Sequence, residues 1–355
     1  MLSAFDYKNN SIGFLRFLLA SAVIWSHSFP LGGFGLDPVQ RFSGGTETAG
    51  TLAVAGFFFL SGFLITRSYE TSGGLALFLW HRFLRIFPGF WACLAVTAFA
   101  FAPLAFALER GSLAGFSAAA NPIGYVVNNA LLQIRQANVG ASLLAKNPYP
   151  DAFNASLWTL QYEFLCYLGI GLLGALGVMR RGRFSILLIA VALFVVFAAP
   201  PLMVAQVRSE PIAFRVLELF LYFAIGSCAY LYRDYIPVNG VAAAVCAAAA
   251  LAALPTHAYA AVLPVCLPYA IAYVAMRWPI RNFDRYADFS YGLYIYAFPV
   301  QQMLALAGAS VAGQPINFVL AFGATLGLAV ASWFLVEKPS LSRKHVFDAR
   351  RKEYR

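Results

Sequence analysis

Long apolar runs bounded by polar or charged residues recur along the whole chain. A helix needs about 20 mainly apolar residues to cross a bilayer. By that rule the pattern predicts ten membrane-spanning helices, at roughly 12–31, 51–69, 86–108, 156–178, 184–204, 214–232, 240–255, 259–276, 290–309 and 317–336. The shorter stretch 121–134 is interrupted by Asn128, Asn129 and Gln133, which indicates an interfacial or re-entrant helix. The pattern therefore predicts an all-α, polytopic transmembrane helix bundle.

The composition excludes a soluble protein. Apolar residues make up 61% of the 355 residues and charged residues only 11%, whereas a soluble domain carries about 25% charged residues. The five cysteines lie in apolar runs without a C-x-x-C pair, so we expect neither disulfides nor a metal site from them. We expect one membrane-embedded domain over 1–355, with a short cytoplasmic tail at 338–355 and no fused extracytoplasmic domain.

The excess of basic residues, 25 Lys+Arg against 15 Asp+Glu, reflects topology. An even number of spans places both termini on one side of the membrane. If that side is the cytoplasm, 19 of the 25 basic residues lie inside, and six lie outside: Arg41, Arg110, Arg135, Lys146, Arg208 and Arg215. The positive-inside rule therefore favours an N-in, C-in orientation, and membrane lipids rather than nucleic acid as the partner of these charges.

Ionisable residues inside spans are costly, so each is a candidate functional residue. Arg16 and His27 lie eleven residues apart in the first predicted span. On an α-helix that spacing places both on one face, about 16 Å apart. A neutral imidazole at membrane depth can act as a general base. The alternative is a packing histidine, and we favour the functional interpretation.

Glu163 lies in the fourth predicted span at a depth similar to that of His27. A carboxylate at that depth can orient the imidazole and stabilise its protonated form. The alternatives for Glu163 are a structural ion pair or a partner for Arg215. Glu218 follows Arg215 by three residues, so a local helical pair accounts for it.

Arg82 and Arg85 share a helix face at the predicted inner end of the third span. Two guanidiniums on one face suit phosphate recognition, although the spacing alone favours an anchor to lipid headgroups. The long external segment 109–155 suits a lid or an acceptor-binding surface. Membrane-embedded His, Glu and Arg also suit a proton-coupled transporter, so these residue types do not separate the two functions.

Several stretches carry a resemblance to a known family. They are Arg16 and His27 with ten residues between them, FFFLSGFLITR (57–67), Arg82-x-x-Arg85, SLWTLQYEF (156–164), DFSYGLYIYAFPVQQ (288–302) and WFLVEKP (333–339). In this order, across nearly the whole chain, they resemble the acyltransferase-3 family of integral membrane acyltransferases. Two positions depart from the family pattern: Ala297 stands where a histidine is frequent, and Thr159 replaces a serine.

The resemblance implies transfer of an acyl group, usually acetyl from acetyl-CoA, to a hydroxyl of a carbohydrate or glycolipid acceptor. Such acceptors include O-antigens, exopolysaccharides and lipo-oligosaccharides. By resemblance, His27 is the catalytic residue, and Arg16, Arg82, Arg85 and Glu163 are its functional partners. Ala297 argues that the family's second histidine has no required role here.

We therefore expect an O-acyltransferase of the bacterial inner membrane that needs no metal. In this hypothesis Arg82, Arg85 and Arg16 hold the CoA phosphates, and His27 and Glu163 form the catalytic pair. Three further residues are expected to bind substrate: Trp158, Tyr162 and Ser61. Ser61 lies beside Gly62, which equally suits close helix packing. The alternative function is a proton-coupled transporter or flippase for a glycolipid or acyl carrier, with His27 and Glu163 as a proton relay.

Overall fold

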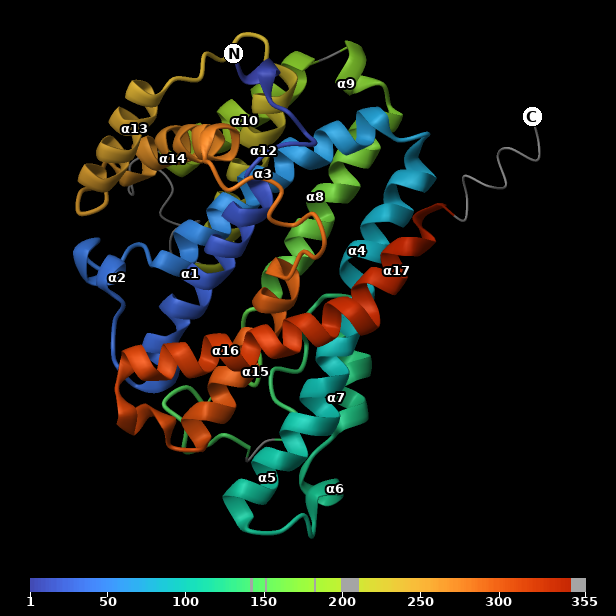
Figure 1. Ribbon diagram of the computed structural model, residues 1–355, viewed down its shortest axis with the longest axis vertical. Coiled ribbons are helices and arrows are strands. Elements are labelled where there is room, and N and C mark those ends of the chain that lie inside the picture. The colour runs from blue at the N-terminus through green and yellow to red at the C-terminus, as the bar shows by residue number, and fades with distance from the viewer. Residues whose placement is uncertain (141–142, 151, 182, 199–210, 346–355) are drawn as a thin grey trace, which may run out of the picture. The chain divides into compact units, whose positions relative to one another are not determined.

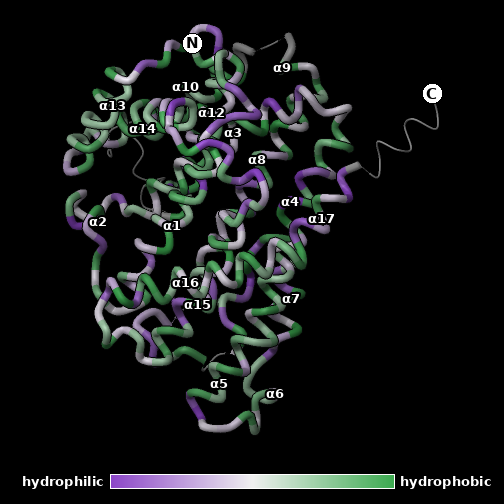
Figure 2. Tube along the Cα trace, in the orientation of Figure 1, coloured by the Kyte–Doolittle hydropathy of each residue, from purple (hydrophilic) through white to green (hydrophobic). Residues whose placement is uncertain are grey.

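The computed structural model describes residues 1–140, 143–150, 152–181, 183–198 and 211–345, and every regular element in these ranges is a helix (Figure 1). The prediction of an all-α protein is confirmed. Figure 2 shows hydrophobic residues predominating along α10, α13 and α14, as lipid-facing helices require. Residues 199–204 of the fifth predicted span and residues 346–355 of the predicted tail lie outside the described residues.

A helix occupies each of the ten predicted segments. These helices are α1 (Ile12–Gly32), α3 (Ala49–Thr71), α4 (Leu75–Val96) with α5 (Ala102–Arg110), α8 (Trp158–Ala175), α10 (Arg183–Ala198), α12 (Pro211–Leu231), α13 (Gly240–Ala253), α14 (Tyr259–Arg277), α15 (Ser290–Leu306), and α16 (Gln314–Ser332) with α17 (Lys338–Ser342). One turn of π-helix, Thr97–Phe101, joins α4 to α5, and another, Trp333–Glu337, joins α16 to α17.

Six of these helical segments are long and apolar enough to cross a membrane: Ile12–Gly32, Ala49–Thr71, Leu75–Arg110, Ile212–Leu231, Tyr259–Arg277 and Gln314–Ser342. The chain is therefore a multi-pass membrane protein. Two shorter apolar helices, Ile186–Ala198 and Gly240–Ala253, fall below that length among the described residues. The count of ten spans and the N-in, C-in orientation stay predictions.

Short helices occupy several connections: α2 (Pro38–Phe42), α6 (Phe116–Ala119), α7 (Pro122–Asn129) and α9 (Val178–Arg181). The predicted helix at 121–134 is present but shorter. The Asn121 side chain caps α7 by accepting a hydrogen bond from the Gly124 amide. The helix ends at Asn129, and the chain then turns through Leu132, which has a positive φ of 70°.

The chain divides into two compact units, each built from separate stretches of sequence. The first unit comprises Met1–Leu19, Pro38–Leu79 and Tyr162–Tyr286. The second unit comprises Ala20–Asp37, Trp80–Gln161 and Ala287–Arg355. Helices α1, α4 and α8 contribute residues to both units. A single domain over 1–355 stays a prediction.

In the first unit, α3 and α12 pack with their backbones in contact. A Cβ atom added at Gly62 would overlap the Phe223 carbonyl oxygen, and one added at Gly226 would overlap the Phe59 carbonyl oxygen. Lipid tails are as apolar as the side chains, so close packing of this kind is what associates membrane helices. The interpretation of Gly62 as a close-packing residue is confirmed.

We expect Gly62→Ala to lower the free energy of unfolding by about 1–3 kcal/mol, because the added methyl group forces α3 and α12 apart. Thermal unfolding of the purified protein in detergent measures the effect. Gly169→Ala in α8 is the matched control, since a Cβ there meets no atom within 4 Å. Equal stability of the two variants would contradict the packing account.

In the second unit, α15 is the central helix and is buried along most of its length. It approaches α16 closely, because a Cβ at Gly292 would overlap Ala329. It is bonded to α4 by the Tyr291 hydroxyl, which donates to the Ile86 carbonyl at 2.7 Å. The motif that first singled out this region, residues 288–302, is thus the helix around which the second unit is built.

Candidate active site

His27 lies in the half of α1 that belongs to the second unit, between two buried serines, Ser26 and Ser28. Its imidazole meets the Phe298 ring of α15 edge to face, with the ring centroids 5.4 Å apart. The Nδ1 atom of His27 is buried, and no residue that the structure describes forms a hydrogen bond with it. A buried polar atom without a partner is unusual in a folded protein, and a catalytic role is one explanation for such an atom.

Two glutamines form hydrogen bonds to α1, one on each side of His27 in the sequence. The Gln301 side-chain amide donates to the Ile24 carbonyl at 2.8 Å, and the Gln314 amide donates to the Ser28 hydroxyl at 2.8 Å. Gln301 comes from α15 and Gln314 begins α16. The position of the imidazole is therefore set by α15 and α16 together.

Asp37 is the carboxylate nearest in sequence to His27 within the second unit, ten residues further along the chain. Its side chain is almost fully buried, with 1% exposed. The Ser26 hydroxyl donates to its Oδ2 atom at 2.5 Å, and the carboxylate interacts electrostatically with His27. Sequence reasoning missed Asp37 because it searched the spans, whereas Asp37 follows one. The available signal was an acidic residue in the connection directly after a span that contains a histidine.

Part of segment 109–155, which the sequence predicts to be external, is bonded to α15 close to the phenylalanine that contacts His27. The Asn147 side chain donates to the Gln302 Oε1 atom at 2.8 Å, and the Gln302 amide donates to the Tyr149 carbonyl at 2.7 Å. The Tyr149 ring also packs edge to face on Phe298, with the centroids 5.6 Å apart. Phe298 therefore contacts both His27 and Tyr149.

A proline in α15 provides a further attachment point for this segment. Pro299 has no N–H, so the Ile295 carbonyl has no helical partner four residues ahead. That carbonyl instead accepts hydrogen bonds from the Asn154 side chain at 2.9 Å and from the Cys93 thiol at 3.2 Å. Asn154 in turn accepts a hydrogen bond from the Ser156 hydroxyl, just before α8.

The start of α8 is bonded to α15 through Thr159. Its hydroxyl lies 2.5 Å from the Tyr294 hydroxyl, which donates to the Ser156 carbonyl at 3.0 Å. Threonine therefore keeps the hydroxyl of the serine that it replaces in the family pattern. Trp158, the preceding residue, is half-buried in the same unit.

Glu163 and Ser61, predicted separately, lie together in the first unit. The Glu163 Oε1 atom accepts hydrogen bonds from the Tyr167 hydroxyl at 2.5 Å and from the Ser61 hydroxyl at 3.1 Å. Tyr162, also in this unit, packs edge to face against Phe220. Because His27 and Glu163 belong to different units, their predicted pairing stays a prediction.

Arg215 pairs with residues other than Glu163. Its guanidinium lies 2.9 Å from Glu47 and 2.7 Å from Glu218. The local pair between Arg215 and Glu218 is confirmed. The alternative reading of Glu163 as the Arg215 partner is wrong, because Glu47, in the connection before α3, takes that place.

Arg85 lies in a network that joins three of the sequence motifs within the second unit. Its guanidinium lies 2.6 Å from Asp288, which precedes α15, and 3.9 Å from Glu337, in the π-helical turn that joins α16 to α17. Glu337 is buried and also accepts a hydrogen bond from the Ser332 hydroxyl. Arg85 thus connects α4 to the residues just before α15 and just after α16.

Lys344 lies near Arg82 and Arg85, outside the apolar helix that ends at Ser342. Burial disfavours its charged form and the two guanidiniums repel it, so the pKa of Lys344 is lowered from its usual value to about 8. Cations crowded in this way favour a bound anion. Sequence reasoning assigned Lys344 to the tail and did not connect it with Arg82 and Arg85.

Arg16 lies in the first unit, where it lines a cavity of about 490 Å³ at the start of α1. Arg82 and Arg85 belong to the second unit. The expectation that all three arginines hold one donor molecule stays a prediction.

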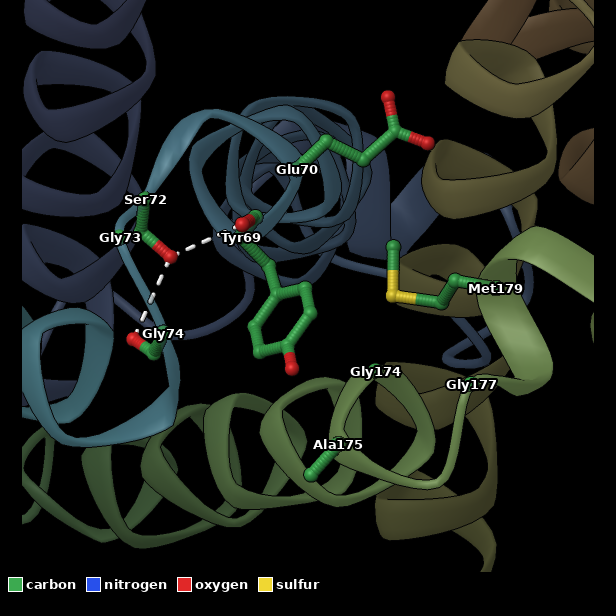
Figure 3. A pocket seen from close by; sticks show the side chains of 9 residues that line it. All are labelled: Tyr69, Glu70, Ser72, Gly73, Gly74, Gly174, Ala175, Gly177 and Met179. Carbon is green, nitrogen blue, oxygen red and sulfur yellow. Dashed lines mark hydrogen bonds between the residues drawn. The ribbon is translucent and has the colours of Figure 1, made fainter.

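A second cavity of about 720 Å³ lies in the first unit where α3 and α8 end (Figure 3). The Tyr69 side chain points towards α8 at Gly174, and the Ser72 hydroxyl donates to the Tyr69 carbonyl at 2.8 Å. Its ionisable lining groups are Tyr69 and Glu70, and the Glu70 carboxylate accepts a hydrogen bond from Tyr230. Among the described side chains that line this cavity, none carries a positive charge. Across both units, the described residues contain no group of three His, Cys, Asp or Glu side chains that could hold a metal ion.

In the second unit, the motif residues His27 and Thr159 thus contact α15, and Arg85 pairs with the aspartate that precedes it. In the first unit, Ser61 of α3 contacts Glu163 of α8. A family model described as an acyltransferase domain, that of the acyltransferase-3 family, matches residues 9–335. The chain belongs to the acyltransferase-3 family. The resemblance drawn from the motifs is confirmed, and the enzyme is a membrane acyltransferase rather than a transporter.

Two relatives of this acyltransferase match over nearly its whole length. An O-acetyl transferase of Shigella phage Sf6 is 28% identical, over 95% of this chain and 97% of the phage protein. Nodulation protein 10 of Rhizobium leguminosarum bv. viciae is 27% identical, over 96% of each chain. No solved structure matches the acyltransferase.

Proposed function

We propose that the enzyme transfers an acyl group, most simply acetyl, from cytosolic acyl-CoA to a hydroxyl of a carbohydrate acceptor at the outer side of the bacterial inner membrane. The acceptor would be a surface polysaccharide, an O-antigen, an exopolysaccharide or a glycolipid. The setting of His27 carries this proposal: a half-buried imidazole with an unengaged Nδ1 atom and a buried carboxylate as its electrostatic partner. The name of the phage relative, O-acetyl transferase, supports acetyl as the group transferred.

In the proposed reaction, His27 takes the proton of the acceptor hydroxyl while that oxygen attacks the thioester carbonyl. The tetrahedral intermediate then expels the CoA thiolate, which receives the proton from the imidazolium. The products are the O-acyl acceptor and free CoA. Asp37 stabilises the positive charge that forms on His27, because a buried carboxylate interacts strongly with a nearby cation.

The acceptor side is proposed to include Tyr149, Trp158 and Tyr162. Tyr149 contacts Phe298, the residue that packs on His27, so an acceptor held by Tyr149 would lie within reach of the imidazole. Aromatic rings present broad apolar faces on which a sugar ring can pack. The remainder of segment 109–155 is proposed to cover the acceptor.

The donor side is proposed to include Arg82, Arg85 and Lys344. Arg85 already has two carboxylates in contact, so its charge is partly compensated. Burial lowers the pKa of Lys344, and repulsion by the nearby Arg82 and Arg85 guanidiniums lowers it further. A phosphate group is the ligand that best relieves this repulsion, since guanidiniums bind phosphate through charge-assisted hydrogen bonds.

The KM for acyl-CoA is expected to rise as the pH increases through about 8, the pKa of Lys344. Below that pH Lys344 is protonated and attracts phosphate, whereas above it the amine is neutral. The phosphates of the donor do not titrate in this range, since their last pKa is about 6. Lys344→Arg should flatten the profile, because arginine stays charged. An identical rise in KM for wild type and Lys344→Arg would contradict this assignment.

Glu163→Gln is expected to lower turnover at least tenfold, roughly the value of a charge-assisted hydrogen bond, while leaving protein abundance unchanged. Glutamine keeps the shape of the side chain, and it can still accept the hydroxyl bonds from Ser61 and Tyr167, but it loses the charge. Initial rates in membranes with matched protein levels measure the effect. Full activity would restrict Glu163 to a structural role.

The proposed reaction is tested with acetyl-CoA labelled in its acetyl group. Purified enzyme in lipid nanodiscs is mixed with glycan extracted from cells that lack it, and labelled glycan and released CoA are measured. We expect one acetyl group on the glycan for each CoA released. Release of CoA without labelled glycan would overturn the proposed acceptor. Absence of both products would overturn the proposed donor.

A further inference from the structure

The cavity beside Arg16 is lined by more basic than acidic residues. Its walls come from the N-terminal segment, the start of α1, the end of α3 and the connection between α14 and α15, all in the first unit. Its volume of about 490 Å³ is typical of small-molecule sites. Four basic residues, Lys8, Arg16, Arg67 and Arg285, line it together with one acidic residue, Asp284.

Three of these cations have no acidic partner. Among the described residues, no carboxylate lies within ion-pair distance of Lys8, Arg67 or Arg285. Like charges that share a cavity repel one another, and the low-dielectric wall strengthens the field inside it. A ligand with several negative charges would be bound more tightly here than by scattered surface lysines.

The wall of the cavity is preformed. The Arg67 guanidinium lies 3.8 Å from the centroid of the Tyr7 ring, which itself stacks on Phe63. A guanidinium held on an aromatic face keeps its N–H groups at the edge for an anion. The Asn282 amide donates to the Asn10 carbonyl at 3.0 Å, which fastens the α14–α15 connection to the N-terminal segment.

We propose that this cavity binds the phosphorylated ribose of the acyl donor's nucleotide, and that Lys8, Arg67 and Arg285 make the enzyme select a donor that carries the 3′-phosphate on this ribose. The inference rests on the proposed function and names the recognition site for its donor. An anionic lipid headgroup shares the phosphate chemistry, but a phosphodiester offers a single charge to a cavity with three surplus cations. Asp284 would repel a bare phosphate, whereas it can accept a hydrogen bond from a ribose hydroxyl or a base amino group.

The test is equilibrium binding of CoA and of dephospho-CoA to the full-length protein in phosphatidylcholine nanodiscs. Wild type should bind CoA at least tenfold more tightly than dephospho-CoA, about the value of one charge-assisted contact. The Lys8→Ala/Arg285→Ala variant should lose at least tenfold in CoA affinity and bind the two ligands nearly equally. Both side chains are exposed, so the fold should tolerate the change. Arg281→Ala is the control for Arg285, since it removes one positive charge from the same connection but outside the cavity lining.

Unchanged CoA affinity in the double variant, or equal wild-type affinity for CoA and dephospho-CoA, would overturn the inference. The lipid alternative is tested by adding phosphatidylglycerol to the nanodiscs. If the double substitution changes only phosphatidylglycerol binding, the cavity is a headgroup site and the inference is wrong. If wild type transfers acetyl from acetyl-CoA while the variant behaves like Arg281→Ala, only the inference fails. A wild-type protein that binds no CoA would overturn the proposed function as well.

Discussion

His27→Asn is expected to lower the rate of acyl transfer by a factor of about 10² to 10⁴, the usual contribution of a positioned general base. Asparagine can form hydrogen bonds but cannot accept the acceptor's proton at neutral pH. The loss should appear in kcat rather than in the KM for either substrate. Initial rates with purified protein at matched concentrations measure it.

Ser28→Ala is the matched control for this prediction. Ser28 follows His27 on α1 and accepts a hydrogen bond from Gln314, so its loss perturbs the same stretch of helix without removing a base. We expect less than a tenfold change in rate for Ser28→Ala, because a neutral hydrogen bond contributes about 1 kcal/mol. Comparable losses in the two variants would indicate that His27 is a packing residue.

Asp37→Asn is expected to lower kcat by about 10- to 100-fold with little change in KM, because it removes a charge that stabilises the imidazolium. Asp37 acts through His27 and is therefore a positioning residue. Its buried carboxylate, bonded to the Ser26 hydroxyl, is held in place before any substrate binds. Steady-state kinetics with the donor and the acceptor varied separately measure the effect.

Two further variants separate an electrostatic role of Asp37 from a structural one. Asp37→Glu keeps the charge and should recover part of the lost activity, whereas Ser26→Ala removes one hydrogen bond and should cost tenfold or less. If Asp37→Glu is as inactive as Asp37→Asn and unfolds at a lower temperature, Asp37 has a structural role and does not stabilise the positive charge on His27.

The helices could be predicted because a lipid environment leaves few choices. Backbone groups at membrane depth must bond within the helix, so each apolar run becomes a helix. The errors lie at the charged ends. The third helix begins at Leu75 rather than at 86, and the last continues to Ser342. Arg85 and Glu337 look like span boundaries in the sequence, but their ion pairing allows helices to continue through them.

The candidate site could be predicted only where its residues lie inside apolar runs. His27 and Glu163 are conspicuous there, because a polar group in a span is costly. Asp37 and Tyr149 lie in connections and Lys344 follows the last long helix, and in such places polar residues are ordinary and give no local signal. Their relation to the site depends on contacts between distant segments, such as Tyr149 on Phe298, that periodicity does not encode.

The pairing of charges shows the same limit. A pairing of Glu163 with Arg215 was one alternative that the sequence left open, yet Glu47 takes that place from a connection. The pair formed by Arg215 and Glu218 was predictable, because residues three apart on a helix are neighbours whatever the fold. Pairs within one helix can therefore be predicted from their spacing in the sequence. Pairs between distant segments can be predicted only when the packing of the helices is known.

The most direct test of the central claim is glycan analysis of cells that lack this protein, complemented with wild type or His27→Asn at equal membrane abundance. O-acyl groups are measured by mass spectrometry and NMR. The account predicts that wild type restores an O-acyl group on a surface glycan and that His27→Asn does not. Equal acylation in the two complemented strains would contradict the role of His27, and no acyl difference between the deletion and wild type would contradict the carbohydrate acceptor.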